Sequence, residues 1–511
     1  MNHNQIGEYT TKDEEGRPII NPTESKEHIA NYFEDLYQAR EGDKSHENWT
    51  KHIDKTVIHI EETEQQETHE TINKFTMEEL DKVIKTLKRG KSTGPDRIPN
   101  EIFIEADKKT KTIIINIMNK IYETEQIPNE WQEGEIMRIY KGKGEKGKCS
   151  NERGITLSSN AGKVFERLIN NRIQEVVEIT ELQAGGQKGK ATTDHINIMN
   201  SIINYNKARR KPTHIAFLDV TKAYDKAWLN AIMYTLNKSG LKGKNWRIVK
   251  KLNENLSAKI RTQHGLTRRI TIKDSIRQGG LLSVIEYANL MDEIAKQMKN
   301  DNIGTTKVWN HDITGCLLWM DDVALIHDNK EELEKMLETT NDIAKRFHIK
   351  FGKEKSQIIS ISSHETNTLS LNLGDMTLDN TTTYKYLGIT ANHRGNMLNH
   401  IKNLKGKAEA AIQTIFSIAG NNNFHHMEMA TIWRLVDVCI MPILTYGAEA
   451  WTATQAEIQQ IQTIRDSIIK RILKTPITTP SEALTTETGI LDIECIRAKK
   501  TNNILPRNNE Q

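Results

Sequence analysis

The segment "CLLWMDDVALI", residues 316–326, places two adjacent carboxylates, Asp321 and Asp322, between apolar runs. Like charges held side by side in an apolar frame cost free energy unless a positive group shares the site. Apolar residues on both sides of a short polar pair are typical of a β-hairpin with the pair at its tip. We therefore predict a strand–turn–strand unit with a cation near the two acids. The alternative is an ordinary surface turn.

A second acid in a similar apolar frame is Asp219 in "IAFLDVTKAYD". If the two strands are neighbours, Asp219 and Asp321 face each other across a sheet. Two or three carboxylates gathered there would attract Mg²⁺, which prefers hard oxygen ligands. Two such ions about 3.5–4 Å apart support an in-line phosphoryl displacement. The alternative is that each Asp caps a turn.

The order of elements around these acids predicts the sheet. A strand at 215–220 precedes a helix at 225–240, the strand pair around the two Asp residues, a helix at 331–347 and a strand at 356–362. That succession is typical of a ferredoxin-like sheet, in an α/β (α+β) protein.

The flanking regions are predicted to be mainly helical. An amphipathic helix is expected at 25–40, and helical segments alternate with Gly/Lys loops over 75–205, where Thr76 and Glu79 form a capping box. From about residue 399 the chain reads as helical, and we interpret the Ile stripe within 456–473 as core packing.

Composition indicates a polar but globular chain of 511 residues, with 36% hydrophobic and 27% charged residues. No apolar run approaches the roughly 20 residues that span a bilayer, and "MNHNQIGEYT" lacks the features of a signal peptide. The four cysteines never form a C-x-x-C pair, which argues against a disulfide framework or a zinc site. We expect an intracellular protein with no membrane partner.

The net charge of +3 hides an asymmetry, because residues 1–80 carry 19 acidic against 8 basic residues. Residues 240–273 carry ten Lys/Arg and one Glu, and 138–153 carry six and two. Such clusters suit a phosphate backbone, and the alternative is a solvated basic face. The loop "GKGEKGKC", 142–149, approaches a P-loop but has Cys149 where a hydroxyl should reach magnesium, so we reject an NTPase loop.

Nine segments, taken together, resemble reverse transcriptases, most closely those of LINE-type (non-LTR) retrotransposons. In chain order they are "GKSTGPDRIPNEIF", "NERGITLSSNAGKVFERLINNRI", "LQAGGQKGKATTDHI", "FLDVTKAYDK", "SIRQGGLLSVIEYANLMDEI", "WMDDVALIHD", "IKFGKEKSQII", "YKYLGI" and "ILTYGAEAW". The resemblance runs from about Gly16 to Cys495. It implies a right-hand polymerase fold with helical fingers, a ferredoxin-like palm and a helical thumb. The expected divisions are an acidic N-terminal extension (1–60), fingers (61–205), palm (206–395), and thumb with C-terminal segment (396–511).

The resemblance also implies residue roles. Asp219 and Asp321 would ligate two Mg²⁺ ions, with Val220 completing the site and Asp322 supporting it. Lys355 would protonate the leaving pyrophosphate, and its alternative is an exposed loop lysine.

For the incoming nucleotide, Tyr224 would be the aromatic gate against a ribose 2′-hydroxyl, Gln278 and Gly279 the turn beside the dNTP, and Arg153 a triphosphate contact. Val220 would also border the dNTP. The alternative for Tyr224 is an ordinary core tyrosine, and Arg277 is expected either to join this turn or only to pair with an acid.

The primer end is implied to rest on the turn formed by Tyr386, Leu387 and Gly388. Trp319 and Met320 stand where the family usually has Tyr or Phe followed by Ala, and Trp319 should narrow the space beside the primer terminus.

The implied activity is RNA-directed DNA polymerisation, with an RNA template, a DNA primer or target and dNTPs as partners, in the nucleus or cytoplasm. An endonuclease, if one is needed, would be supplied elsewhere. The alternative is an inactive or truncated relative that only binds RNA or DNA.

Overall fold

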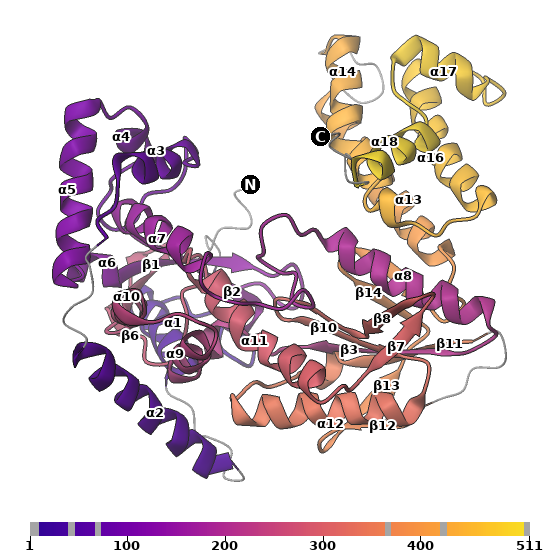
Figure 1. The fold of residues 1–511 in the computed structure, drawn as a ribbon. Coiled ribbons are helices and arrows are strands. Elements are labelled where there is room, and N and C mark those ends of the chain that lie inside the picture. The colour runs from indigo at the N-terminus through magenta and orange to yellow at the C-terminus, as the bar shows by residue number, and fades with distance from the viewer. Residues whose placement is uncertain (1–9, 39–45, 67–72, 363–368, 420–426, 505–511) are drawn as a thin grey trace, which may run out of the picture.

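A computed structural model describes residues 10–38, 46–66, 73–362, 369–419 and 427–504 (Figure 1). Residues 1–9, which make up most of the segment "MNHNQIGEYT" without signal-peptide features, lie outside these ranges. In Figure 1 the predicted fingers and thumb lie at opposite ends of the molecule, and a mixed sheet with its helices joins them from below.

The sheet of the predicted palm has six strands in the order β12–β13–β11–β3–β10–β9. Their bounds are β3 (Thr213–Asp219), β9 (Cys316–Trp319), β10 (Asp322–His327), β11 (Gln357–Ile361), β12 (Leu371–Leu373) and β13 (Met376–Asn380). The four strands β11–β3–β10–β9 are antiparallel throughout. With helices α9 (Leu229–Lys238) and α12 (Lys330–Arg346) between them in sequence, they confirm the predicted ferredoxin-like order.

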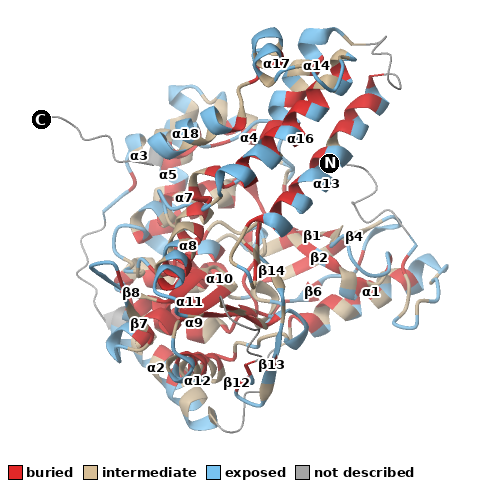
Figure 2. Ribbon diagram, turned by 90° about the vertical axis from the view of Figure 1, so that its right-hand side faces the viewer, coloured by how far each residue is buried: buried red, intermediate tan, exposed pale blue. Residues whose placement is uncertain are grey.

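Both faces of this palm sheet are covered, which explains why β3 reads as a continuous apolar run. Ile215 and Phe217 belong to a cluster with helix α8 (Thr192–Ala208). Ala216 and Leu218 belong to the larger cluster on the opposite side. Figure 2 shows many buried residues around this sheet and further buried residues along helices of the C-terminal part, such as α13 (Leu398–Ile418) and α16 (Gln455–Leu473).

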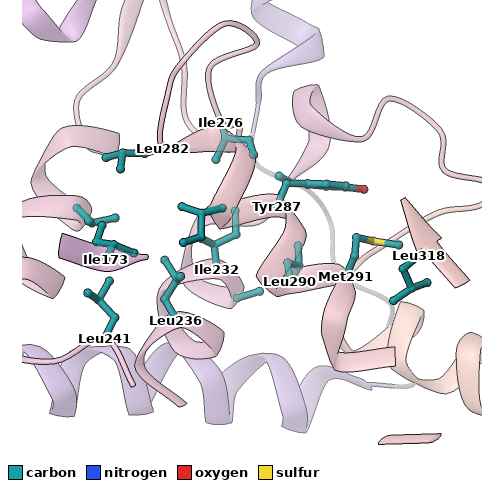
Figure 3. Packing of buried hydrophobic residues seen from close by; sticks show 14 of the residues in the cluster. Ile173, Ile232, Leu236, Leu241, Ile276, Leu282, Tyr287, Leu290, Met291 and Leu318 are labelled. Atoms are coloured by element: carbon teal, nitrogen blue, oxygen red, sulfur yellow. The ribbon is translucent and has the colours of Figure 1, made fainter. Parts of the chain in front are cut away.

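The larger cluster joins the palm sheet to the predicted fingers. Figure 3 shows side chains from α7 (Asn160–Ile173), α9, α11 (Ser283–Asn300) and β9 meeting in one apolar core. Burial of this apolar area contributes roughly 25 cal/mol per Å² and fixes the helices against the sheet.

The fingers contain a second sheet in addition to the expected helices. Its strands are β1 (Glu133–Tyr140), β2 (Glu152–Leu157), β4 (Ser257–Thr262), β5 (Gly265–Leu266) and β6 (Ile270–Thr271). Strands β4 to β6 come from the range predicted for the palm, and β4 pairs in parallel with β1. Helix α1 (Pro22–Leu36) of the acidic N-terminal region packs on this finger sheet. Pairing between segments about 120 residues apart leaves no local signal, so the helical reading of the fingers missed it.

The predicted thumb is helical, and the predicted Ile stripe lies in its core: Ile458, Ile461, Ile468 and Ile472 are buried together. One stretch among the described residues, Met429–Ala450, is long and apolar enough to cross a membrane by length and composition, and 33% of its most apolar window is buried. This differs from the expectation that no segment has that length. Arg434 and Asp437 interrupt the apolar residues, so the stretch does not read as one continuous run.

The other elements complete this framework. The remaining helices are α2 (Glu47–Gln66), α3 (Met77–Lys85), α4 (Asn100–Ile104), α5 (Lys108–Thr124), α6 (Asn129–Gln132), α10 (Gly243–Asn253), α13 (Leu398–Ile418), α14 (Met429–Leu435), α15 (Met441–Leu444), α16 (Gln455–Leu473), α17 (Ser481–Thr488) and α18 (Ile493–Ile504). The remaining strands are β7 (Thr305–Val308), β8 (His311–Thr314), β14 (Thr383–Tyr386) and β15 (Ile389–Asn392). Thr76 and Glu79 form the predicted capping box at α3.

Candidate active site

Three carboxylates meet at one end of the palm sheet. Strands β9 and β10 form the predicted hairpin, with Trp319 opposite Asp322 and the turn at Met320 and Asp321. Across the sheet Asp322 is paired with Asp219, the last residue of β3. Directly opposed residues of antiparallel strands point to the same face, so acids about a hundred residues apart in sequence become neighbours.

Burial and repulsion leave Asp321 and Asp322 harder to ionise than free aspartates. Burial raises the pKa of Asp321, and the charge of Asp219 adds to the effect. Burial, then Asp321 and Asp219, raise the pKa of Asp322 to about 6. This end of the sheet therefore has excess negative charge that a cation would relieve.

Two basic residues supply part of that positive charge. The Lys355 ammonium lies 2.9 and 3.2 Å from the two carboxylate oxygens of Asp219. Lys355 ends the short 3₁₀ turn Lys353–Lys355 that leads into β11, and β11 is the neighbour of β3. Against the effect of burial, the charge of Arg153 lowers the pKa of Asp321, so this residue of β2 also lies close to the acids.

The donor set fits magnesium by its chemistry, since aspartate carboxylates are the hard oxygen ligands that this ion prefers. Val220 follows Asp219 directly and bridges to Phe351, which holds its backbone at the same sheet end. Among the described residues, however, no group of three His, Cys, Asp or Glu side chains is gathered closely enough to hold one ion. Asp219 instead has Lys355 as its partner.

Sequence reasoning assigned no role to Asp225, although this residue lies within the motif "FLDVTKAYDK" that begins at Phe217. Burial raises the pKa of Asp225 to about 6, while the nearby charges of Lys141 and Lys222 lower it. Arg153 opposes burial in the same way. The sequence places Lys222 close to Asp225 along the chain, but it does not reveal that Lys141 and Arg153 also lie near this acid.

Asp225 is the last residue of the segment "IAFLDVTKAYD" and follows Tyr224 directly. Burial lowers the pKa of Lys141, with Asp225 raising it and Lys222, Arg153 and Lys355 lowering it further. The bases around the acids therefore lie close enough to repel one another. A phosphorylated anion placed among them would relieve that repulsion, as magnesium would relieve that of the acids.

Tyr224 lies between the acids and the interior. Its ring stacks on Tyr287 of α11, with centroids 5.0 Å apart and planes at 22°. Burial raises its pKa, and the charge of Asp321 adds to this, so the ring borders the carboxylates. The ring is only partly buried, which leaves the gate role open as a prediction.

The turn after Arg277 is pressed against the finger sheet. The Gln278 carbonyl accepts a hydrogen bond from the Thr156 amide at 2.8 Å. Gly279 has a φ of +115°, and a Cβ there would lie 2.9 Å from the Thr156 carbonyl, so this position requires glycine. Arg277 itself is buried and pairs with Glu166 at 2.9 Å, which is the acid-pairing alternative that the sequence left open.

Of the predicted primer-binding residues, Leu387 and Gly388 form the two-residue turn between β14 and β15, and Tyr386 is the last residue of β14. Leu387 and Gly388 have φ values of 43° and 88°, as a tight hairpin needs. Tyr386 is buried and its ring packs on Phe217, 5.3 Å between centroids. The Tyr386 side chain therefore anchors the turn in the core. The part of this site left to contact a primer is the turn at Leu387 and Gly388.

Trp319 and Met320 are held by the finger segment that begins at Leu182. Gln183 bridges to Leu318 in parallel and its side chain accepts a hydrogen bond from the Met320 amide at 3.1 Å. The Trp319 ring meets His195 of α8 edge to face, 5.9 Å between centroids. The hairpin tip is thus fixed from the finger side.

The basic segment 240–273 is largely neutralised by acids. Eight of its ten Lys and Arg residues form ion pairs: Lys244, Arg247 and Lys251 with Glu125, Lys250 with Glu61 and Glu254, Lys259 and Arg269 with Glu133, Arg261 with Glu135, and Arg268 with Glu27 and Glu34. These ion pairs therefore connect the segment to other parts of the fingers. The loop 142–149 joins the antiparallel strands β1 and β2, so it is not the strand–loop–helix of a P-loop.

Comparison with known proteins identifies the class. Residues 141–391 match the family described as reverse transcriptase (RNA-dependent DNA polymerase). This range contains every predicted site residue, so the match to that family covers the whole candidate site.

Individual relatives point to mobile elements. The chain is 22% identical over 419 residues to a probable RNA-directed DNA polymerase from transposon BS of Drosophila melanogaster, covering 79% of this chain and 45% of the relative. It is 22% identical over 348 residues to a Pol polyprotein of the type-1 retrotransposable element R2 of Popillia japonica, covering 65% and 46%. The chain thus spans a little less than half the length of these relatives. A telomerase structure from Candida tropicalis aligns with 80% of this chain and 71% of its own, at 12% identity and a TM-score of 0.37.

Proposed function

We propose that the protein is an RNA-directed DNA polymerase of the non-LTR retrotransposon type, which extends a DNA primer along an RNA template. The observation that carries this proposal is the pairing of Asp219 with Asp322 across β3 and β10, with Asp321 in the adjoining turn. These acids lie within the reverse transcriptase domain. The name of the relative from transposon BS, a probable RNA-directed DNA polymerase, agrees with this activity.

In the proposed reaction the primer 3′-hydroxyl attacks the α-phosphate of a dNTP, and pyrophosphate leaves. Asp219, Asp321 and Asp322, with the Val220 carbonyl, would hold two Mg²⁺ ions. When bound, these ions would supply charge neutralisation and a more acidic 3′-hydroxyl.

The chain's own residues would orient the reactants. Arg153 would contact the triphosphate, and Gln278 and Gly279 would border the base. Tyr224 would exclude a ribose 2′-hydroxyl by contact. Lys355 would pass a proton to the leaving pyrophosphate, for which its position beside Asp219 is suitable.

The test is primer extension on poly(rA)/oligo(dT) with Mg²⁺ and labelled dTTP. We expect incorporation by the parent protein and none by Asp321→Asn. Absence of incorporation together with salt-sensitive RNA binding would contradict the proposal in favour of a binding protein. Degradation of the labelled primer would contradict it in favour of a nuclease.

A further inference from the structure

Tyr446 of the thumb contacts the turn at Leu387 and Gly388, on which the primer end is predicted to rest. The Tyr446 hydroxyl donates a hydrogen bond to the Leu387 carbonyl at 2.9 Å. Its ring lies against the next residue, since a Cβ on Gly388 would be 2.6 Å from Tyr446 Cε1. Glycine at this position therefore lets the tyrosine ring approach the turn backbone closely.

The same hydroxyl reaches the fingers side of the molecule. Thr192, the first residue of α8, lies 3.1 Å away through its own hydroxyl. A phenol has one proton, and the Leu387 carbonyl can only accept it, so Thr192 is the donor to the Tyr446 oxygen. One oxygen atom thus joins the turn, α8 and the thumb.

Both ends of this connection are fixed. On the thumb side the Tyr446 carbonyl accepts a hydrogen bond from the buried Trp451 indole at 3.2 Å. On the palm side Tyr384, at the other end of β14, stacks on Phe217 at 4.2 Å, two residues before Asp219. The turn is therefore held between the thumb and the strand that carries Asp219.

We infer that Tyr446 is a positioning residue for the primer terminus, which couples the placement of the thumb to the turn at Leu387 and Gly388. This inference rests on the proposed polymerase function. Tyr446 need not touch the primer, because it acts through the turn backbone.

The experiment compares Tyr446→Phe, Thr192→Val, the double variant and the matched control Tyr122→Phe, which removes a hydroxyl in the fingers that bonds Asn245. We expect Tyr446→Phe to raise the KM for primer–template about three- to tenfold, with kcat, the KM for dNTP and the melting temperature unchanged. Thr192→Val should have a smaller effect. The double variant should match Tyr446→Phe alone, because the two groups share one hydrogen bond.

The inference is overturned if Tyr446→Phe equals the parent or the Tyr122→Phe control, or if the two changes simply add. Fluorescence anisotropy with a labelled primer–template duplex, without dNTP, separates this failure from that of the polymerase proposal. A parent that binds the duplex but does not extend it refutes the proposed function, and the duplex Kd then decides the role of Tyr446. A parent that does not bind the duplex refutes both.

Discussion

The acidic end of the palm sheet and the basic segment 240–273 differ in how far their charges are paired with opposite charges of the same chain. In the basic segment most cations have a carboxylate partner, and Glu125 alone pairs with three of them. At the palm end Lys355 forms an ion pair with Asp219, while burial and repulsion raise the pKa of Asp321 and Asp322. Charge matched within the chain stabilises the fold, whereas charge left unmatched is available to a ligand.

The largest expected effect comes from Asp219→Asn. Incorporation should fall on the order of 10³-fold, because electrostatic groups at the reacting atoms contribute factors of this size. The melting temperature should not fall, since the change relieves repulsion with Asp321 and Asp322 while losing only an exposed ion pair. Steady-state primer extension and thermal unfolding check both. Asp328→Asn, just beyond the other end of β10, is the control and should retain activity.

Lys355→Ala tests whether the cation beside the acids takes part in the chemistry. We expect kcat to fall about 100-fold, as for loss of a general acid, with little change in stability. Single-turnover extension measures it. Lys353→Ala, on the same 3₁₀ turn, should leave kcat unchanged. If kcat of Lys355→Ala stays within twofold of the parent value, the Lys355–Asp219 ion pair has only a structural role.

Arg247→Ala tests the opposite region. The Arg247–Glu125 pair is 2.7 Å long and nearly buried, so its loss should lower the free energy of unfolding by about 2 kcal/mol. The salt dependence of RNA binding should not change, because this charge is already matched. Urea denaturation and binding at several salt concentrations measure the two. A smaller salt slope would show that Arg247 contacts phosphate after all, and Glu125→Gln should cause a similar loss of stability.

The smallest expected effect is on pH dependence. The pKa of Asp322 is raised to about 6, so the folded state favours its protonated form. Its contribution to stability is complete below about pH 3.8 and is lost as pH rises through about 6. Asp322→Asn should therefore flatten the decline in the free energy of unfolding between pH 4 and 7, measured by urea denaturation in EDTA.

The control for the pH experiment is Asp107→Asn at the start of α5. Hydrogen bonds from Thr110 lower the pKa of Asp107, so its contribution has the opposite sign and is lost as pH falls. Equal behaviour of the two variants would contradict the view that repulsion among the three acids distinguishes the palm end.

Local patterns predicted the palm well. The hairpin at Asp321 and Asp322 and the strand ending at Asp219 follow from apolar runs, because a buried strand is marked by its own residues. The ferredoxin-like order follows from the succession of strands and helices, which is typical of that sheet. The finger sheet was not predicted, because β1 and β4 pair across about 120 residues. The ion pairs of 240–273 were missed for the same reason, since partners such as Glu125 and Glu34 lie far away in the sequence.

The amino-acid sequence by itself determined the class of this protein, through its ordered motifs. It also determined the strands that carry the acids, through the apolar runs beside them. Only the tertiary structure decided which charges are paired within the chain, such as Arg277 with Glu166. It alone also placed the Tyr446 hydroxyl within hydrogen-bond distance of the Leu387 carbonyl. The physical reason is that hydropathy is recorded residue by residue along the chain, whereas charge pairing and contact depend on distances between segments that folding alone brings together.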